Sequence, residues 1–93
     1  MARLSDDEIE QRLAGGDWLR EGDSLVRDFA CTGFKSAMTL ANAVADAANE
    51  ADHHPDILIH GYKHVRLTLS THSEGGITDN DFALAQTIDR IER

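Results

Sequence analysis

Residues 56–71 have the sequence DILIHGYKHVRLTLST, and this stretch sets the architecture of the chain. Gly61 separates two apolar runs, and in the second run apolar and polar residues alternate with the period of a half-buried strand. We therefore expect strands at residues 56–60 and 64–71, joined by a tight turn. The core face of the second strand is expected to consist of Val65, Leu67 and Leu69.

The N-terminal third predicts a short helix followed by a hairpin. Ser5 with Glu8 forms a capping box, which places a helix start at Ser5, and Gly15-Gly16 ends that helix. Between residues 17 and 31, apolar residues flank the polar stretch 20–23, which is typical of a hairpin turn. Two more strands are therefore expected here.

The middle of the chain predicts a long helix that begins after Thr32 as N-cap and stops before Pro55. A second capping box, made by Thr78 and Asp81, opens a last helix that continues to Ile91. The apolar face of the long helix follows helical spacing and is expected to contain Phe34, Ala37, Met38, Ala41, Val44, Ala45 and Ala48.

These elements give the order α-β-β-α-β-β-α within a single domain, residues 1–93. Strand pairs joined by hairpins favour an antiparallel four-stranded sheet, and the apolar helix faces must be buried against it. The sequence therefore predicts a two-layer α+β sandwich.

Composition excludes several classes of function. A formal net charge of −8 opposes binding to nucleic acid or to an anionic membrane surface, and no segment approaches the ~20 apolar residues of a membrane span. The acidic start at residues 5–8 does not fit a signal peptide, and Cys31 is the only cysteine. We expect a cytoplasmic protein in which Cys31 has a structural role.

Five histidines lie between positions 53 and 72, and three of them stand where elements end. His53 and His54 follow the long helix, and His72 follows the last strand. Because imidazole has an unperturbed pKa of about 6.5, such a cluster can provide a general acid and a general base. His60 and His64 flank the turn between two strands and are expected to be solvated.

Other interpretations of the same residues stay open. His53 and His54 can cap the C-terminus of the long helix, and Asp81 can serve only as the acidic partner in its capping box. A metal site built from His53 or His54 with His72 is conceivable, although no cysteine and no HExxH spacing accompanies it.

The order of these residues resembles the signature of the pterin-4a-carbinolamine dehydratase family. The signature elements are His53-His54-Pro55, then Tyr62, then His72, then Asp81, with Asp52 ahead of them. The chain is similar to the family over nearly its whole length, including Leu67 to His72 along the strand. It departs from the family at Asn49, where an acidic residue is usual, and after Pro55, where Ile57 replaces a frequent aromatic residue.

The resemblance implies a lyase that dehydrates 4a-hydroxy-tetrahydropterin to quinonoid dihydropterin and thereby recycles the pterin of aromatic amino-acid hydroxylases. It implies that His53, His54 and His72 are catalytic and that Asp52, Pro55 and Asp81 bind substrate. No metal or organic cofactor is implied, because the pterin is the substrate.

The family also implies a homodimer or homotetramer, which agrees with the small core and the open edges of the predicted sheet. Two alternatives remain. One is a protein-binding or dimerisation module of the same fold, with a hydroxylase as one conceivable partner. The other is a related enzyme of molybdopterin metabolism.

Overall fold

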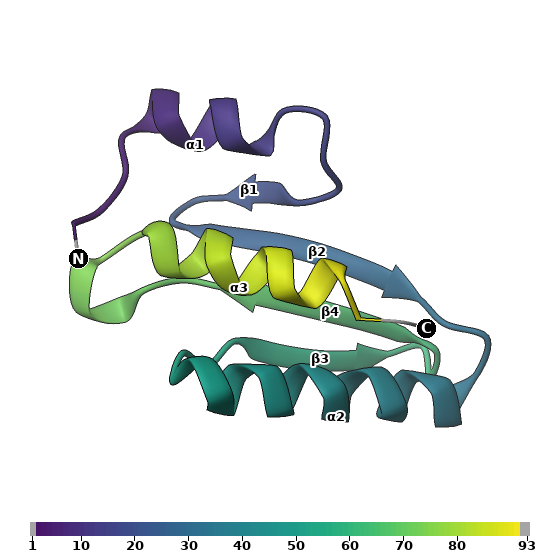
Figure 1. Cartoon of the computed structure of the whole chain (residues 1–93). Coiled ribbons are helices and arrows are strands. Elements are labelled where there is room, and N and C mark those ends of the chain that lie inside the picture. Colours follow the sequence, from purple (N-terminus) through teal and green to yellow (C-terminus); the bar gives the residue numbers. More distant parts are fainter. Residues whose placement is uncertain (1, 92–93) are drawn as a thin grey trace.

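Among the residues that the structure describes, four strands form one antiparallel sheet in the order β1-β2-β4-β3 (Figure 1). A computed structural model describes residues 2–91. The central strands β2 and β4 pair from Leu25 opposite Leu69 to Ala30 opposite His64, so segments far apart in sequence lie side by side. The strand bounds are β1 Leu19–Glu21, β2 Ser24–Ala30, β3 Asp56–His60 and β4 His64–Leu69.

Within residues 2–91, three helices accompany the sheet, and one hydrophobic core joins all of them to it (Figure 1). Val65, Leu67 and Leu69 are fully buried in this core, which confirms the predicted inner face of β4. The predicted order α-β-β-α-β-β-α and the two-layer α+β fold are also confirmed. The helices are α1 Asp6–Leu13, α2 Phe34–Ala51 and α3 Asp79–Asp89, and a 3-10 turn spans His72–Glu74.

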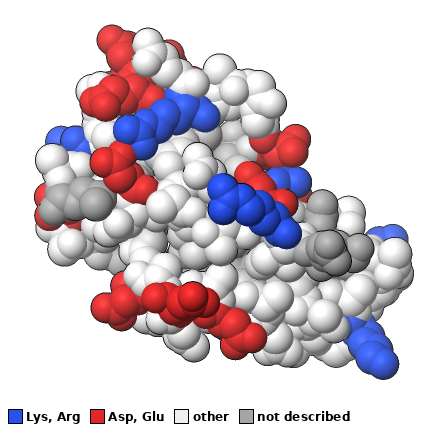
Figure 2. All heavy atoms as spheres, in the orientation of Figure 1, with Lys and Arg blue, Asp and Glu red and all other residues white. Residues whose placement is uncertain are grey.

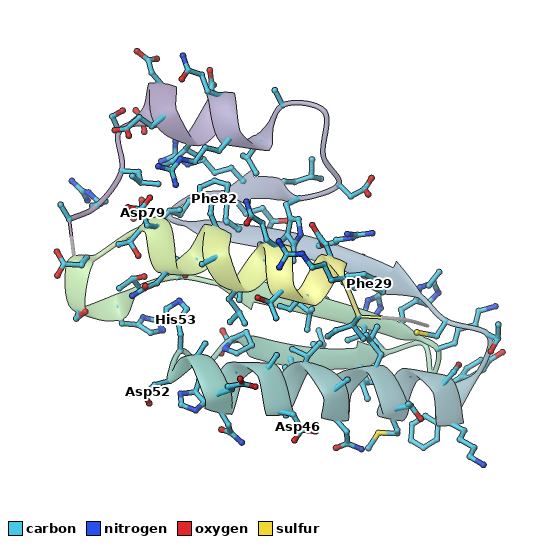
Figure 3. All side chains as sticks on the ribbon, viewed as in Figure 1. Phe29, Asp46, Asp52, His53, Asp79 and Phe82 are labelled. Atoms are coloured by element: carbon cyan, nitrogen blue, oxygen red, sulfur yellow. The ribbon has the colours of Figure 1, made fainter. Side chains whose placement is uncertain are left out.

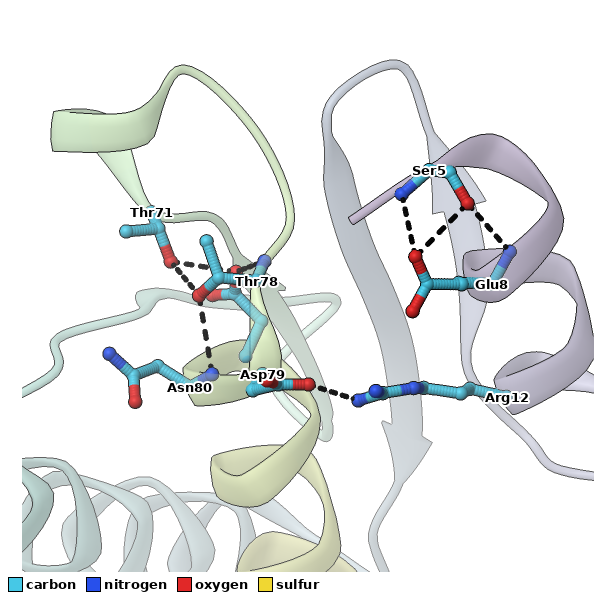
Figure 4. A network of polar contacts seen from close by, with 8 residues as sticks. Ser5, Glu8, Arg12, Thr71, Thr78, Asp79 and Asn80 are labelled. Atoms are coloured by element: carbon cyan, nitrogen blue, oxygen red, sulfur yellow. Dashed lines mark hydrogen bonds and ion pairs between the residues drawn. The ribbon is translucent and has the colours of Figure 1, made fainter. Parts of the chain in front are cut away.

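Both predicted capping boxes are present (Figure 4). At α1, the Glu8 N–H donates to Ser5 Oγ at 3.2 Å. At α3, the Thr78 N–H donates to Asp81 Oδ2 at 2.9 Å, and the Asn80 N–H donates to Thr78 Oγ1 at 3.2 Å. The start of α3, and with it the position of Asp81, is therefore fixed by local hydrogen bonds.

The expected N-cap of α2 was wrong by one residue. Gly33, not Thr32, is the N-cap, and its N–H donates to Ser36 Oγ at 3.0 Å. Thr32 instead shares a hydrogen bond between its hydroxyl and that of Ser36, at 3.1 Å. Ser36 therefore satisfies the N–H of the N-cap residue, while the N-cap itself has no side chain that could accept from the first turn.

The buried face of α2 also differs from the expected one. Phe34 and Met38 were predicted to be buried, but they are 57% and 40% exposed. Ala37, Val44 and Leu40 are buried, although Leu40 lay outside the predicted set. The apolar arc of this helix is wider than the surface that the sheet and α3 cover, so its Phe34–Met38 side remains open.

Surface charge agrees with the acidic composition. Figure 2 shows acidic side chains over α1 and along α2 in this view. Within residues 2–91, no helix has both the length and the apolar character needed to cross a bilayer. Cys31 is half-buried and packs against the core, as expected for a structural cysteine.

Candidate acid/base site

The end of α2 turns the chain toward α3 at the first predicted site residue. Asp52 adopts the left-handed conformation, with φ 51° and ψ 42°, which is accessible to aspartate. The His53 N–H then donates back to the Ala48 carbonyl oxygen at 3.1 Å. As a result, His53 points from the end of α2 toward α3, whereas the exposed Asp52 lies on the outer side (Figure 3).

His53 forms a short hydrogen bond with Asp81. The distance from His53 Nε2 to Asp81 Oδ1 is 2.6 Å. The His53 side chain is 15% exposed and the Asp81 side chain is fully buried. The structure therefore joins two predicted site residues that are 28 positions apart, His53 just after the end of α2 and Asp81 on α3.

The second carboxylate oxygen of Asp81 is held as firmly as the first. Asp81 Oδ2 accepts the Thr71 hydroxyl at 2.8 Å and the Thr78 N–H at 2.9 Å. The hydroxyls of Thr71 and Thr78 also bond each other at 2.8 Å (Figure 4). Asp81 is thus an acceptor fixed in orientation, and His53 lies at the exposed end of the network.

The other two predicted catalytic histidines are more exposed than His53 and, within residues 2–91, their side chains have other partners or none. His54 is exposed, and its Nε2 lies 3.1 Å from Asn49 Oδ1. His72 is exposed at the start of the 3-10 turn. Neither makes a hydrogen bond or ring contact with His53 among the residues described. Each does adjoin a member of the network along the chain, because His54 follows His53 and His72 follows Thr71.

Asn49, where the resemblance led us to expect an acidic residue, lies beside His54. Its side-chain oxygen is the partner of His54 Nε2. Pro55 is half-buried and leads directly into β3. In the part of the chain that the structure covers, no three His, Cys, Asp or Glu side chains are grouped so that they could hold a metal ion.

His60 and His64 lie on the face of the sheet away from this site. Their rings stack at 5.2 Å between centroids, and His60 Nε2 lies 2.9 Å from Asp28 Oδ1. Arg66 donates to Asp28 Oδ2 at 3.0 Å. The hydrogen bond from His60 lowers the pKa of Asp28, and Arg66 acts in the same direction against the opposing effect of desolvation. His60 is exposed as expected, but His64 is half-buried and neither ring is a free surface group.

Thr71 and Thr78 belong to the site, although their sequence positions did not predict this. Thr78 was identified only as a helix cap. In the expected strand, Thr71 lies on the same face as Val65, Leu67 and Leu69, so a polar residue occupied a predicted core position. That mismatch was the available signal, because a buried hydroxyl needs a hydrogen-bond partner.

The site and the fold define a class: a two-layer α+β protein with a buried aspartate supporting a histidine at the end of the long helix. A family model described as pterin 4 alpha carbinolamine dehydratase matches residues 2–91. The chain belongs to this family.

Individual relatives agree with this assignment. A protein of Mycobacteroides abscessus named for pterin-4-alpha-carbinolamine dehydratase is 51% identical over 90 residues, which covers 96% of this chain and 95% of the relative. A relative of the same name from Thermomicrobium roseum is 48% identical over 91 residues and covers 95% of each chain.

Two solved structures are similar in fold. The crystal structure of a transcriptional coactivator/pterin dehydratase from Brucella melitensis superimposes with a TM-score of 0.86 at 30% identity and covers 94% of this chain and 95% of that one. A pterin dehydratase-like RuBisCO assembly factor of the alpha-carboxysome has a TM-score of 0.65 at 24% identity, and covers 81% and 88% of the two chains. The second likeness concerns the fold alone.

Proposed function

We propose that this protein dehydrates 4a-hydroxy-tetrahydropterin to quinonoid dihydropterin. The observation that carries the proposal is the His53–Asp81 hydrogen bond, in which a fully buried carboxylate supports an imidazole that is still partly open to solvent. Membership of the pterin-4a-carbinolamine dehydratase family supports the choice of substrate.

The reaction requires two proton transfers. The bond between carbon 4a and its hydroxyl oxygen breaks, and that oxygen takes a proton and leaves as water. A ring nitrogen loses its proton, and the electron pair of that N–H bond forms the new carbon–nitrogen double bond. Imidazole groups suit both steps because they give and take protons near neutral pH.

His53, His54 and His72 share these transfers in our proposal. Asp81 orients His53 through the 2.6 Å hydrogen bond. Asp52 and Pro55, which flank the histidine pair, contact the bound pterin. The reaction needs no metal and no further cofactor.

The biological setting follows from the substrate. The 4a-hydroxy adduct arises when an aromatic amino-acid hydroxylase consumes its tetrahydropterin, and we propose that this protein returns the product to that cycle. A molybdopterin-related compound is the competing substrate. To distinguish the two candidate substrates, the rate of conversion of each compound is measured with the same protein preparation.

The test is a stopped-flow measurement of the decay of 4a-hydroxy-tetrahydropterin with and without the protein. We expect acceleration by the wild type and a loss of roughly 10²- to 10⁴-fold in His53→Ala, the usual range for general acid/base assistance. His60→Ala is the matched control, because His60 bonds Asp28 on the other face of the sheet, and its rate should stay within about twofold.

Two results would contradict the proposal. Wild-type protein that does not accelerate the decay would favour the binding-module alternative. A His60→Ala variant that loses the rate while His53→Ala keeps it would show that the site is misplaced.

A further inference from the structure

The buried polar side chains of this protein are concentrated at one point. Thr71, Thr78 and Asp81 are 8%, 0% and 0% exposed, and they are the buried polar side chains within residues 2–91. All three belong to the network that ends on His53. Burying polar groups is unfavourable unless they are fully hydrogen-bonded, so the position of this network requires an explanation.

The donors in the network can be assigned in order. A hydroxyl has one hydrogen to donate. Because Thr71 donates its hydrogen to Asp81 Oδ2, the Thr78 hydroxyl must be the donor in the bond between the two threonines. Thr78 in turn accepts from the Asn80 N–H. The chain of donors therefore runs from Asn80 through Thr78 and Thr71 to Asp81.

The same accounting fixes the tautomer of His53. Asp81 Oδ2 already accepts two donors, so only Oδ1 faces the imidazole. A carboxylate that accepts hydrogen bonds from Thr71 and Thr78 has no hydrogen of its own to donate, so Nε2 carries the hydrogen in the contact with Oδ1. Nδ1 is then the nitrogen with a free lone pair, and it has no hydrogen-bond partner among the residues described.

We propose that Thr71 is a positioning residue: through Asp81 it holds His53 in the tautomer protonated on Nε2 and leaves Nδ1 to exchange protons with the substrate. The effect on catalysis rests on the proposed function, whereas the tautomer does not. The orientation of a histidine by a hydrogen-bonded carboxylate, itself held by a second partner, is a general device for fixing the reactive nitrogen.

The backbone around Thr71 keeps its hydroxyl in place. Thr71 forms an isolated bridge with Gly76, in which the Thr71 N–H donates to the Gly76 carbonyl oxygen at 2.9 Å. Glu74 N–H donates to the Thr71 carbonyl oxygen at 3.0 Å. The hydroxyl is therefore presented from a closed loop, directly beside the proposed catalytic residue His72.

Thr71→Val tests the proposal because valine keeps the branched shape of the side chain and removes the donor. We expect kcat to fall by about 10-fold with KM within about twofold, the scale of loss seen when a partner that orients a histidine is removed. Thr71→Ser keeps the oxygen and should retain the wild-type kcat. Thr68→Val is the control, since Thr68 lies on β4 three residues before Thr71 but shares the outer face of the sheet with Arg66.

Imidazole ¹⁵N chemical shifts give a readout that does not depend on activity. In wild-type protein, His53 should have the shifts of a histidine protonated on Nε2. In Thr71→Val, Asp81 loses one of the two donors on Oδ2, so the His53 shifts should move toward those of a mixture of tautomers. They should not move in Thr71→Ser or in Thr68→Val.

Three results would overturn the proposal: wild-type His53 protonated on Nδ1, a Thr71→Val protein with unchanged kcat and shifts, or a Thr71→Ser protein as impaired as Thr71→Val. If Thr71→Val does not fold, two results can still overturn the proposal. They are a wild-type spectrum with His53 protonated on Nδ1 and a loss of kcat in Thr71→Ser. A wild-type protein without dehydratase activity whose His53 shifts respond to Thr71→Val would contradict the proposed function and leave the tautomer assignment standing.

Discussion

Asp81 has a fully buried carboxylate whose two oxygens accept three hydrogen bonds. In Asp81→Asn, one oxygen is replaced by an amide group that would face either the His53 Nε2–H or the donors from Thr71 and Thr78. A buried donor facing a donor costs about 1–3 kcal/mol. For a domain of this size we expect Tm to fall by at least roughly 4 °C in thermal unfolding.

The neighbouring residue Asp79 provides the control for this measurement. Its carboxylate is 53% exposed and pairs with Arg12 at the surface (Figure 4). Exposed pairs of this kind contribute little, so Asp79→Asn should change the unfolding free energy by less than about 1 kcal/mol. Equal losses in the two variants would show that burial of Asp81 is not the cause.

His53, His54 and His72 should show non-additive effects if they act on one substrate. A first alanine substitution removes one proton route, and a neighbouring imidazole or water then covers part of the loss. We expect the rate of a double variant to be much higher than the product of the two single losses predicts. Strictly multiplicative losses in the stopped-flow assay would mean that the three histidines work independently.

Part of the site was predictable from single residues. The spacing of the Thr78–Asp81 capping box predicted that Asp81 lies in the first turn of the last helix. The resemblance to a family predicted that His53 is a site residue. The bond between His53 and Asp81 was not predictable from spacing, because it depends on how α2 and α3 lie on the sheet. The role of Thr71 was missed because a threonine at the end of a strand is ordinary until its partner is known.

At the scale of elements, the ion pair between Asp28 on β2 and Arg66 on β4 makes the free energy of unfolding depend on pH. The pKa of Asp28 is lowered by its hydrogen bond from His60, with Arg66 acting in the same direction. A lowered folded-state pKa stabilises the fold above the unfolded-state value of about 3.9, and this stabilisation is lost as pH falls through the folded-state value.

The measurement compares Tm of wild type and Asp28→Asn across pH. The difference should be steady above about pH 5 and shrink as pH falls below about 4. Because Asp28, His60 and Arg66 are each about 40% exposed, the difference should be small and should decrease further with added salt. A difference that grows as pH falls would contradict the stated direction of the shift.

The elements themselves were largely predictable, and the orientation of α2 was not. Alternation in β4 and the two capping boxes depend on local geometry, which sequence spacing encodes directly. The apolar arc of α2 is rich in alanine and wider than one face, so periodicity located the helix without deciding which side the sheet covers. That side is centred on Val44 and includes Leu40, whereas Phe34 was expected to be buried and is exposed.

For the molecule as a whole, exposed apolar side chains predict self-association. Phe34 and Met38 project from α2, and Leu58, which is 53% exposed, projects from the neighbouring edge strand β3. A free strand edge beside exposed apolar groups favours pairing with another chain. We expect sedimentation at micromolar concentration to give a mass above that of the monomer.

Phe34→Glu should lower that mass by placing a charge in the contact. Leu19→Glu is the matched control, because Leu19 is 68% exposed on β1 at the opposite edge of the sheet. A monomeric wild type would contradict the prediction of self-association. A Leu19→Glu variant that dissociates while Phe34→Glu does not would place the contact at β1.

The long sequence separations within the site affect how the protein folds. His53 bonds a residue 28 positions away, and Trp18, which is 6% exposed, donates its indole N–H to Asp89, 71 positions away. Contacts between distant positions form late, because the chain must first close the intervening loops. During refolding from denaturant, dehydratase activity should therefore return no earlier than the fluorescence of buried Trp18. Partly folded chains would then bind no pterin productively, and the protein would begin to act only when its fold is complete.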